Sequence, residues 1–183
     1  ITSLAWKTLR TASAAPFYVI GDPSVFSGPV MTISDPSEAA DVFSTALPVL
    51  KASEKLPTIQ IGTPDSKTAP AILESIELAT THALEGKAGG VVTNPISKAV
   101  LYSAGFAHPG HTEFLAALCE RATGTACPPV MMLVGGGLRV SLVTIHIPLL
   151  AIPSLLSEDL IRSVVLTTAN ALQRDFGLTR PRI

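Results

Sequence analysis

Short apolar runs alternate with longer amphipathic segments along this chain. The apolar runs have the length and the turn-forming boundaries of buried strands, and the amphipathic segments have the spacing of helices. Strands that alternate with helices predict an α/β fold with α/β/α layers and a mostly parallel sheet. The predicted strands are residues 16–22, 29–34, 89–92 and two runs within 128–146, and the predicted helices are residues 4–12, 63–90, 96–105, 111–124 and 157–177.

Polar residues mark where several of these elements begin. Asp65 or Ser66 is placed to cap the long helix in the middle of the chain, and Ser157 is placed to cap the last helix. Two acidic residues follow Ser157 and suit the positive end of the helix dipole. Asp35 and Pro36 stand where either a short helix or a loop begins.

The second half of the chain carries a hairpin signal. The triple glycine at residues 135–137 lies between two apolar strands, so it predicts an antiparallel pair beside the parallel sheet. Residues 178–183 have the pattern of one further strand. We expect two partial α/β lobes, residues 1–104 and residues 105–183, because the glycines around position 105 are typical of a boundary.

Composition restricts the class of protein. Of the 183 residues, 47% are hydrophobic and only 15% are charged. Either another subunit or further chain covers apolar surface, or the protein is simply rich in alanine; both readings stay open. The 13 basic and 14 acidic residues form no basic stripe, so we expect no nucleic-acid partner. No apolar run is long enough to span a membrane.

The N-terminal segment and the cysteines indicate in which cellular compartment the protein is expected. The first residues predict an amphipathic helix rather than a signal peptide, and the chain does not begin with Met, so we expect the native start elsewhere. Cys119 and Cys127 are not spaced like metal ligands. We expect free thiols in a reducing compartment rather than a disulfide, and we expect a cytoplasmic protein.

Three turns follow predicted strands, where open α/β sheets bind their ligands. They contain Asp22, then Asn94 and Lys98, and then His146. An imidazole at a strand end can ligate a metal, move a proton or be a satisfied structural group. The chain has no HExxH motif and no cysteine pair that would complete a zinc site, and it has no GxGxxG nucleotide fingerprint.

His111 and Thr112 stand at the start of a predicted helix, in the stretch "GFAHPGHTEFLA". Either Thr112 caps this helix, or the two side chains together bind a phosphate or hydroxyl group at its anion-favouring end. Lys98 is either a phosphate-binding cation or a solvated surface residue. His108 precedes a proline in a loop and receives no role, and His82 lies within a helix, where we expect a structural place.

Taken together, these motifs closely resemble the 4-hydroxythreonine-4-phosphate dehydrogenase family over most of residues 57–183. The stretches that carry the resemblance are "VVTNPISKAVLYSAGFAHPGHTEFLA", "VMMLVGGGLRVSLVTIHIPL" and "FGLTRPRI". The resemblance implies a two-lobe architecture like that of isocitrate and isopropylmalate dehydrogenases. It implies NAD or NADP, a divalent metal (Zn, Mg, Mn or Co) held by three histidines, and a homodimer with its active sites at the interface.

The resemblance also assigns residues. His111 and Thr112 match the family's substrate-binding pair, and His146 matches its first metal-ligating histidine. Lys98 and Asn94 match a turn whose role is less defined, and members of the family often have Ala or Gly in place of Asn94. The implied reaction is oxidation, with decarboxylation, of 4-phosphooxy-threonine in pyridoxal phosphate (vitamin B6) biosynthesis.

Two departures and two alternatives qualify this assignment. The chain begins after the family's Gly-rich N-terminal segment and ends before its second metal histidine, so we expect a fragment that is inactive alone. The stretch "VFSGPVMTIS" is also shorter than in the family. The alternatives are a related dehydrogenase of a phosphorylated four-carbon sugar acid or a cyclic diol, and a non-catalytic homologue.

Overall fold

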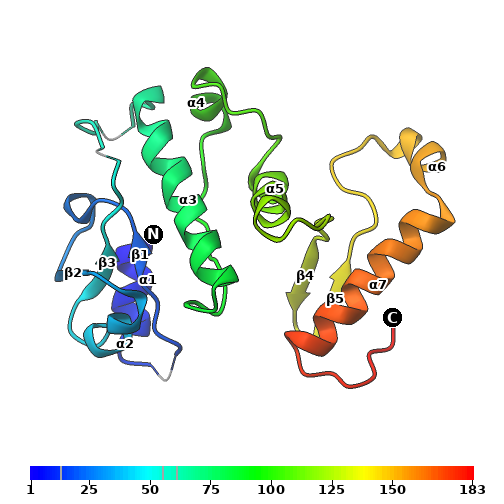
Figure 1. Ribbon diagram of the computed structural model, residues 1–183, viewed down its shortest axis with the longest axis horizontal. Coiled ribbons are helices and arrows are strands. Elements are labelled where there is room, and N and C mark those ends of the chain that lie inside the picture. Colours follow the sequence, from blue (N-terminus) through cyan, green and yellow to red (C-terminus); the bar gives the residue numbers. More distant parts are fainter. Residues whose placement is uncertain (13, 55, 61) are drawn as a thin grey trace. The chain divides into compact units, whose positions relative to one another are not determined.

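A computed structural model describes residues 1–12, 14–54, 56–60 and 62–183 of the protein. This part of the chain forms two compact units, Ile1–Cys127 and Pro128–Ile183 (Figure 1). The division between the units lies C-terminal to residues 104 and 105, where the sequence predicts a boundary between lobes. The lobe boundary of the whole protein stays a prediction.

The first unit is built on a three-stranded parallel sheet. Its strands are β1 (Val19–Ile20), β2 (Val30–Ile33) and β3 (Leu47–Leu50), with β3 in the centre. Leu50 pairs with Ile20 on one side and with Ile33 on the other, so the carboxyl ends of the three strands share one edge. The parallel sheet predicted for an α/β fold is confirmed, and β1 and β2 fall within the predicted runs.

The central strand, β3, was not predicted. Pro48 lies inside it and is fully buried, and proline cannot donate a ladder hydrogen bond. Prolines therefore usually stand in edge strands or outside sheets, and the sequence around Pro48 lacks the ordinary signal of a central strand. Burial of the neighbouring side chains compensates for the hydrogen bond that Pro48 cannot donate, because Leu47 and Val49 are 1% and 0% exposed.

Helices make up most of the remainder of the first unit. The longest, α3 and α5, pack against each other, and α1 packs on the sheet (Figure 1). The elements are α1 (Thr2–Leu9), η1 (Pro23–Val25), η2 (Pro36–Glu38), α2 (Ala39–Val42), η3 (Ser66–Thr68), α3 (Ala69–Leu84), α4 (Lys98–Ser103) and α5 (His111–Thr123).

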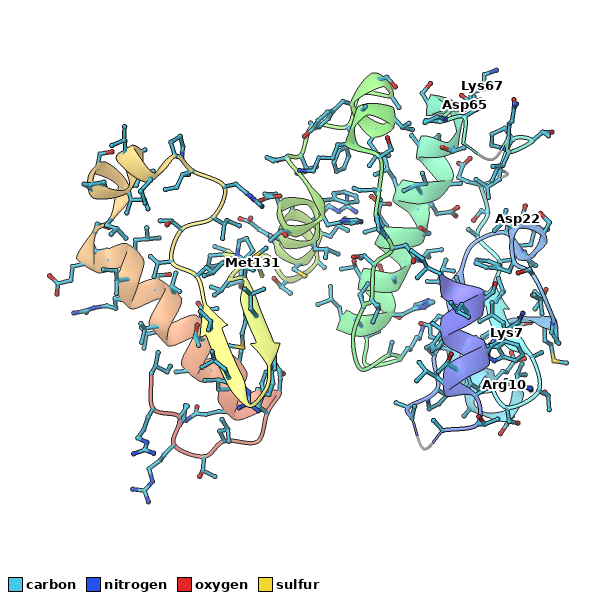
Figure 2. All side chains as sticks on the ribbon, turned by 180° about the vertical axis from the view of Figure 1, so that it is seen from behind. Lys7, Arg10, Asp22, Asp65, Lys67 and Met131 are labelled. Carbon is cyan, nitrogen blue, oxygen red and sulfur yellow. The ribbon has the colours of Figure 1, made fainter. Side chains whose placement is uncertain are left out.

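Aspartates start three of the short helices. The carboxylates of Asp22, Asp35 and Asp65 each accept a hydrogen bond from the backbone N–H two residues further on, at 2.9 Å. Figure 2 labels Asp22 and Asp65 at the starts of η1 and η3. Asp35 also forms a capping box with Glu38. Asp35 starts a short helix, one of the two outcomes that the sequence left open. Asp65 caps η3 rather than the long helix α3, whose N-cap is Thr68 without a side-chain hydrogen bond, so the predicted cap lies one short turn before the long helix.

Two hydrophobic clusters hold the first unit together. In the first, the indole of Trp6 is 1% exposed and its Nε1 donates to the carbonyl of Phe43 at 2.8 Å. This bond fixes α1 to the chain that leads into β3. The second cluster joins Ile76 of α3 to Phe114 and Leu118 of α5. Buried aromatic rings belong to both clusters, Trp6 and Phe43 to the first and Phe114 to the second.

The second unit contains the predicted hairpin. Strands β4 (Met132–Gly135) and β5 (Leu138–Ser141) are antiparallel, and α7 (Glu158–Arg174) follows them after η4 (Leu149–Ala151) and α6 (Ile152–Leu155). The Ser157 side chain accepts from Leu160 N–H at 3.1 Å, as its capping role predicts. The guanidinium of Arg139 lies 4.8 Å from the ring centroid of Phe176, which links β5 to the chain after α7.

Two predicted strands do not form. Residues 89–92 and 178–183 are irregular, and the side chain of Val92 is 98% exposed. A strand needs a neighbour that accepts and donates its backbone hydrogen bonds, and apolar sequence alone does not supply one. The second strand of the hairpin also ends earlier than predicted, at Ser141.

Two further predictions concern the cysteines and membranes. Both Cys119 and Cys127 are free thiols, as predicted. Burial raises the pKa of the Cys119 thiol, which keeps it protonated at neutral pH. Across the described residues, no helix has the length and apolar character that crossing a membrane requires.

Candidate functional site

Three predicted site residues lie in the two helices that flank the turn between α4 and α5: Lys98 in α4, and His111 and Thr112 in α5. Gly105 follows the C-cap of α4 and has the left-handed conformation, at φ 88°. Gly105 N–H donates to the carbonyl of Tyr102 and Phe106 N–H donates to the carbonyl of Leu101, both at 3.0 Å. These two bonds form a Schellman motif, which ends the helix and turns the chain toward α5.

His111 and Thr112 are the first two residues of α5, and both are half-buried. The residue before them, Gly110, is the N-cap, and no side chain caps this helix. Thr112 therefore does not act as the cap, which was one of the two roles considered for it. The first backbone N–H groups of a helix have no partner inside the helix and favour an anion or a hydroxyl oxygen.

Lys98 reaches the same turn from the start of α4. A Cβ atom placed on buried Gly110 would lie 3.4 Å from Lys98 Nζ and 3.3 Å from Glu113 Oε2. The ammonium and the carboxylate thus approach Gly110 closely, and a larger residue would displace them. The backbone of Gly110 is extended, so its small size rather than its conformation suits this position.

Asn94 contacts a different part of the first unit. Its amide Nδ2 donates to Thr2 Oγ1 at 3.0 Å, and Asn94 is exposed. It borders a hollow of about 590 Å³ whose walls also include the start of α1, Lys7 and Phe26. Lys7 is labelled on α1 in Figure 2. The amide is therefore a neighbour of α1.

His146 lies in the second unit, beyond the end of β5, in an irregular and exposed stretch. Its φ is 57°, and among the described residues it is the one non-glycine with a positive φ. Left-handed backbone is unfavourable for a side-chain-bearing residue, and such strain is concentrated at functional sites. In the described ranges no three His, Cys, Asp or Glu side chains gather as a metal site.

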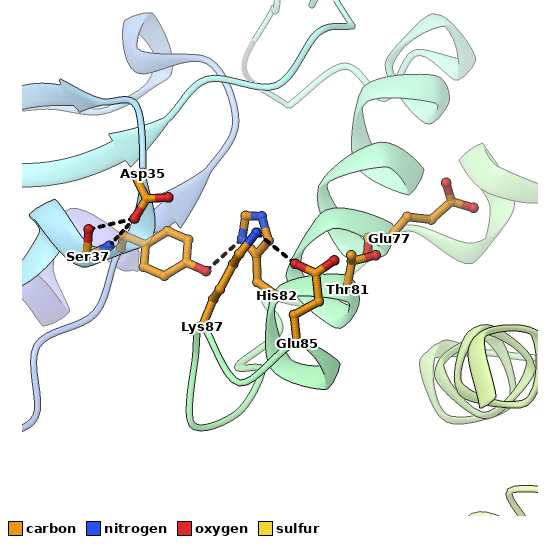
Figure 3. A network of polar contacts seen from close by, with 8 residues as sticks. Asp35, Ser37, Glu77, Thr81, His82, Glu85 and Lys87 are labelled. Atoms are coloured by element: carbon orange, nitrogen blue, oxygen red, sulfur yellow. Dashed lines mark hydrogen bonds and ion pairs between the residues drawn. The ribbon is translucent and has the colours of Figure 1, made fainter.

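His82 has the structural place that the sequence predicts. The Tyr18 hydroxyl lies 2.9 Å from His82 Nδ1, and Lys87 pairs with Glu85 at 2.8 Å beside it (Figure 3). Burial, and then the charge of Asp35, raises the pKa of Tyr18. The phenol therefore stays protonated and can donate to the imidazole, and this contact ties the end of α3 to the residue directly before β1.

Two residues beside the start of α5, Tyr102 in α4 and His108 in the turn, received no role from the sequence. The Tyr102 hydroxyl donates to the carbonyl of Pro109 at 3.1 Å. The ring of His108 packs beside those of Phe106 and Phe114, with centroid distances of 5.3 and 5.1 Å. The clustering of five aromatic or imidazole rings within residues 102–114 was the available signal.

The chain matches one protein family over most of its length. A family model described as "Pyridoxal phosphate biosynthetic protein PdxA" matches residues 12–183. The 4-hydroxythreonine-4-phosphate dehydrogenase of Caulobacter vibrioides is 44% identical over 189 residues, which cover 100% of this chain and 56% of the relative. That of Bradyrhizobium diazoefficiens is 41% identical and is covered to 57%. The chain thus spans about half the length of the curated relatives it matches.

Solved structures agree with the sequence relatives. A 4-hydroxythreonine-4-phosphate dehydrogenase from Burkholderia phymatum superposes with a TM-score of 0.81 at 27% identity, covering 98% of this chain and 56% of that one. The enzyme from Klebsiella pneumoniae gives 0.79 at 28% identity, covering 98% and 57%. Together with the match over residues 12–183, these similarities show that the chain belongs to the PdxA family of pyridoxal phosphate biosynthetic proteins.

Proposed function

We propose that this chain is part of an NAD- or NADP-dependent dehydrogenase that oxidises and decarboxylates 4-phosphooxy-threonine in pyridoxal phosphate biosynthesis. The names of the relatives, 4-hydroxythreonine-4-phosphate dehydrogenases, support the reaction class. The observation that carries the proposal is the uncapped start of α5, where His111 and Thr112 stand and to which Lys98 extends.

Substrate binding is the role of His111 and Thr112 in this proposal. The imidazole and the hydroxyl bind polar groups of the substrate, and the free N–H groups of the first turn of α5 stabilise negative charge beside them. Lys98 brings its ammonium to Gly110, beside the carboxylate of Glu113 and close to this turn. Asn94 acts through its contact with α1 rather than on the substrate.

Metal binding is the proposed role of His146. An exposed imidazole on a left-handed backbone is presented to a ligand by its loop, which fits a metal-ligating histidine. Bound together, a divalent ion (Zn, Mg, Mn or Co) and the nicotinamide supply Lewis acidity at the substrate hydroxyl and an acceptor for hydride. A single histidine does not complete such a site, so the proposal requires further ligands beside His146.

A second subunit is also part of the proposal, because His146 alone does not complete a metal site. We propose a homodimer with its active sites at the subunit interface, in a cytoplasmic protein whose thiols stay reduced. Two exposed apolar residues of the hairpin, Leu133 at 58% and Leu138 at 64%, are consistent with surface that a partner covers. The near-balance of charge gives no reason to propose a nucleic-acid partner.

A substrate panel tests the proposed reaction. The full natural chain is mixed with each substrate and NAD or NADP, with and without a chelator, and reduced nicotinamide and carbon dioxide are measured. Release of both from 4-phosphooxy-threonine, and loss of both with the chelator, is the expected result. Turnover only of a phosphorylated four-carbon sugar acid or a cyclic diol would replace the substrate, and turnover of none would favour a non-catalytic homologue.

A further inference from the structure

The loop that joins α4 to α5 is held at both of its ends. At the α4 end, the Schellman bonds fix Gly105 and Phe106. At the α5 end, the Tyr102 hydroxyl holds the carbonyl of Pro109 at 3.1 Å, immediately before the N-cap Gly110. The start of α5 is therefore tied to α4 by a hydrogen bond from a side chain as well as by the chain itself.

Three rings, two from this loop and one from α5, pack against one another. The centroids of Phe106, His108 and Phe114 lie 5.1 to 5.3 Å from one another, and the pair Phe106–Phe114 is edge-to-face. Phe114 is 7% exposed and belongs to the cluster that joins α3 to α5. Phe106 packs against the same cluster, so Phe106 and His108 are the two rings through which the loop contacts the core of the first unit.

We propose that His108 and Tyr102 are positioning residues for the substrate-binding pair His111 and Thr112. This inference rests on the proposed function. The rings hold the loop from inside and the Tyr102 hydroxyl holds Pro109, so Gly110 keeps its place against Lys98 and the first turn of α5 keeps its direction.

A purely structural role would have a different effect. Loss of packing alone lowers the stability of the unit and leaves the substrate affinity of the folded enzyme unchanged. Loss of positioning frees Pro109 and Gly110, so that His111 and Thr112 occupy their binding geometry for only part of the time. The Michaelis constant then rises, and restoring a ring at position 108 corrects it.

Four variants of the full natural chain test this inference. His108→Ala removes the ring, His108→Phe keeps one, and Tyr102→Phe removes only the oxygen that holds Pro109. Phe17→Ala is the matched control, because Phe17 is also half-buried and pairs with Phe43 at 4.9 Å in the other core cluster. KM and kcat for 4-phosphooxy-threonine, and thermal midpoints, are measured for each.

The expected results separate the two roles. His108→Ala raises KM about tenfold, a factor that corresponds to about 1.4 kcal/mol, and changes kcat by less than about twofold. His108→Phe stays within about twofold of the natural enzyme, and Tyr102→Phe raises KM about threefold. Phe17→Ala lowers the thermal midpoint as His108→Ala does, yet its KM is unchanged. Equal KM values for His108→Ala and Phe17→Ala would overturn the inference.

Hydrogen exchange separates this inference from the proposed function. Amide exchange in residues 105–112 needs no substrate, and it should accelerate in His108→Ala and in Tyr102→Phe but not in Phe17→Ala. Unchanged exchange in the first two variants overturns the positioning role, whatever the enzyme turns over. An enzyme that leaves 4-phosphooxy-threonine untouched overturns the proposed function instead, even where exchange accelerates as expected.

Discussion

Replacing His146 by glycine should stabilise the apo protein relative to replacing it by alanine. His146 has a φ of 57°, and a left-handed backbone costs an L-residue about 1–2 kcal/mol. Glycine avoids that cost but gains about 0.4–1 kcal/mol of freedom in the unfolded chain. The difference leaves the His146→Gly variant more stable than His146→Ala by about 0.5–1 kcal/mol. Few packing contacts enter the comparison, because the side chain is exposed.

The assay is thermal or urea unfolding of the full natural chain with a chelator present, so that metal binding does not contribute. For a domain of about 150–250 residues, a change of about 1 kcal/mol in the free energy of unfolding shifts the thermal midpoint by about 2–4 °C. We expect the midpoint of His146→Gly to lie about 2 °C above that of His146→Ala.

A matched pair at an ordinary helical position gives the control. Glu120 lies exposed in α5, where glycine is about 1 kcal/mol less favourable than alanine. Glu120→Gly should therefore be less stable than Glu120→Ala, which is the opposite order. If His146→Gly were also less stable than His146→Ala, the reasoning from a strained backbone at this residue would be refuted.

Two other predictions concern the first unit. Tyr18→Phe removes the hydroxyl that bonds His82 Nδ1, and it should lower the free energy of unfolding by about 1 kcal/mol in urea titrations; no change would show that the bond adds nothing. Hydrogen bonds from Ser53, and then from the Glu54 backbone, lower the pKa of Glu74 from 4.5. The ionised carboxylate therefore stabilises the folded protein fully above pH 4.5, and this stabilisation is lost as the pH falls through the pKa of the folded state. Glu74→Gln should thus cost about 1 kcal/mol near neutral pH and little in acid, and a pH-independent cost would contradict this.

Local signals in the sequence predicted the elements that local chemistry determines. Ser157 caps its helix as expected, and Asp35 and Asp65 each cap a short helix at or next to the expected place, because each bond joins residues close in the chain. The hairpin forms around its glycines for the same reason. Strand β3 depends instead on partners on both sides, which outweigh the missing N–H of Pro48.

The candidate site likewise has features that the local sequence predicts and features that depend on how the helices pack. The sequence predicts that His111 and Thr112 begin a helix, because "GHTE" precedes an amphipathic run. It does not predict that Lys98 extends to Gly110, since that approach depends on how α4 and α5 pack. The place of His108 among the rings likewise depends on the path of the loop.

Metal content tests the central claim, that His146 holds the metal which the reaction needs. Elemental analysis of the full natural chain, after dialysis against metal-free buffer, should find a divalent metal in the natural protein and in His111→Ala. The His146→Ala variant, treated in the same way, should have lost it. Retention of the full metal content by His146→Ala would contradict the account.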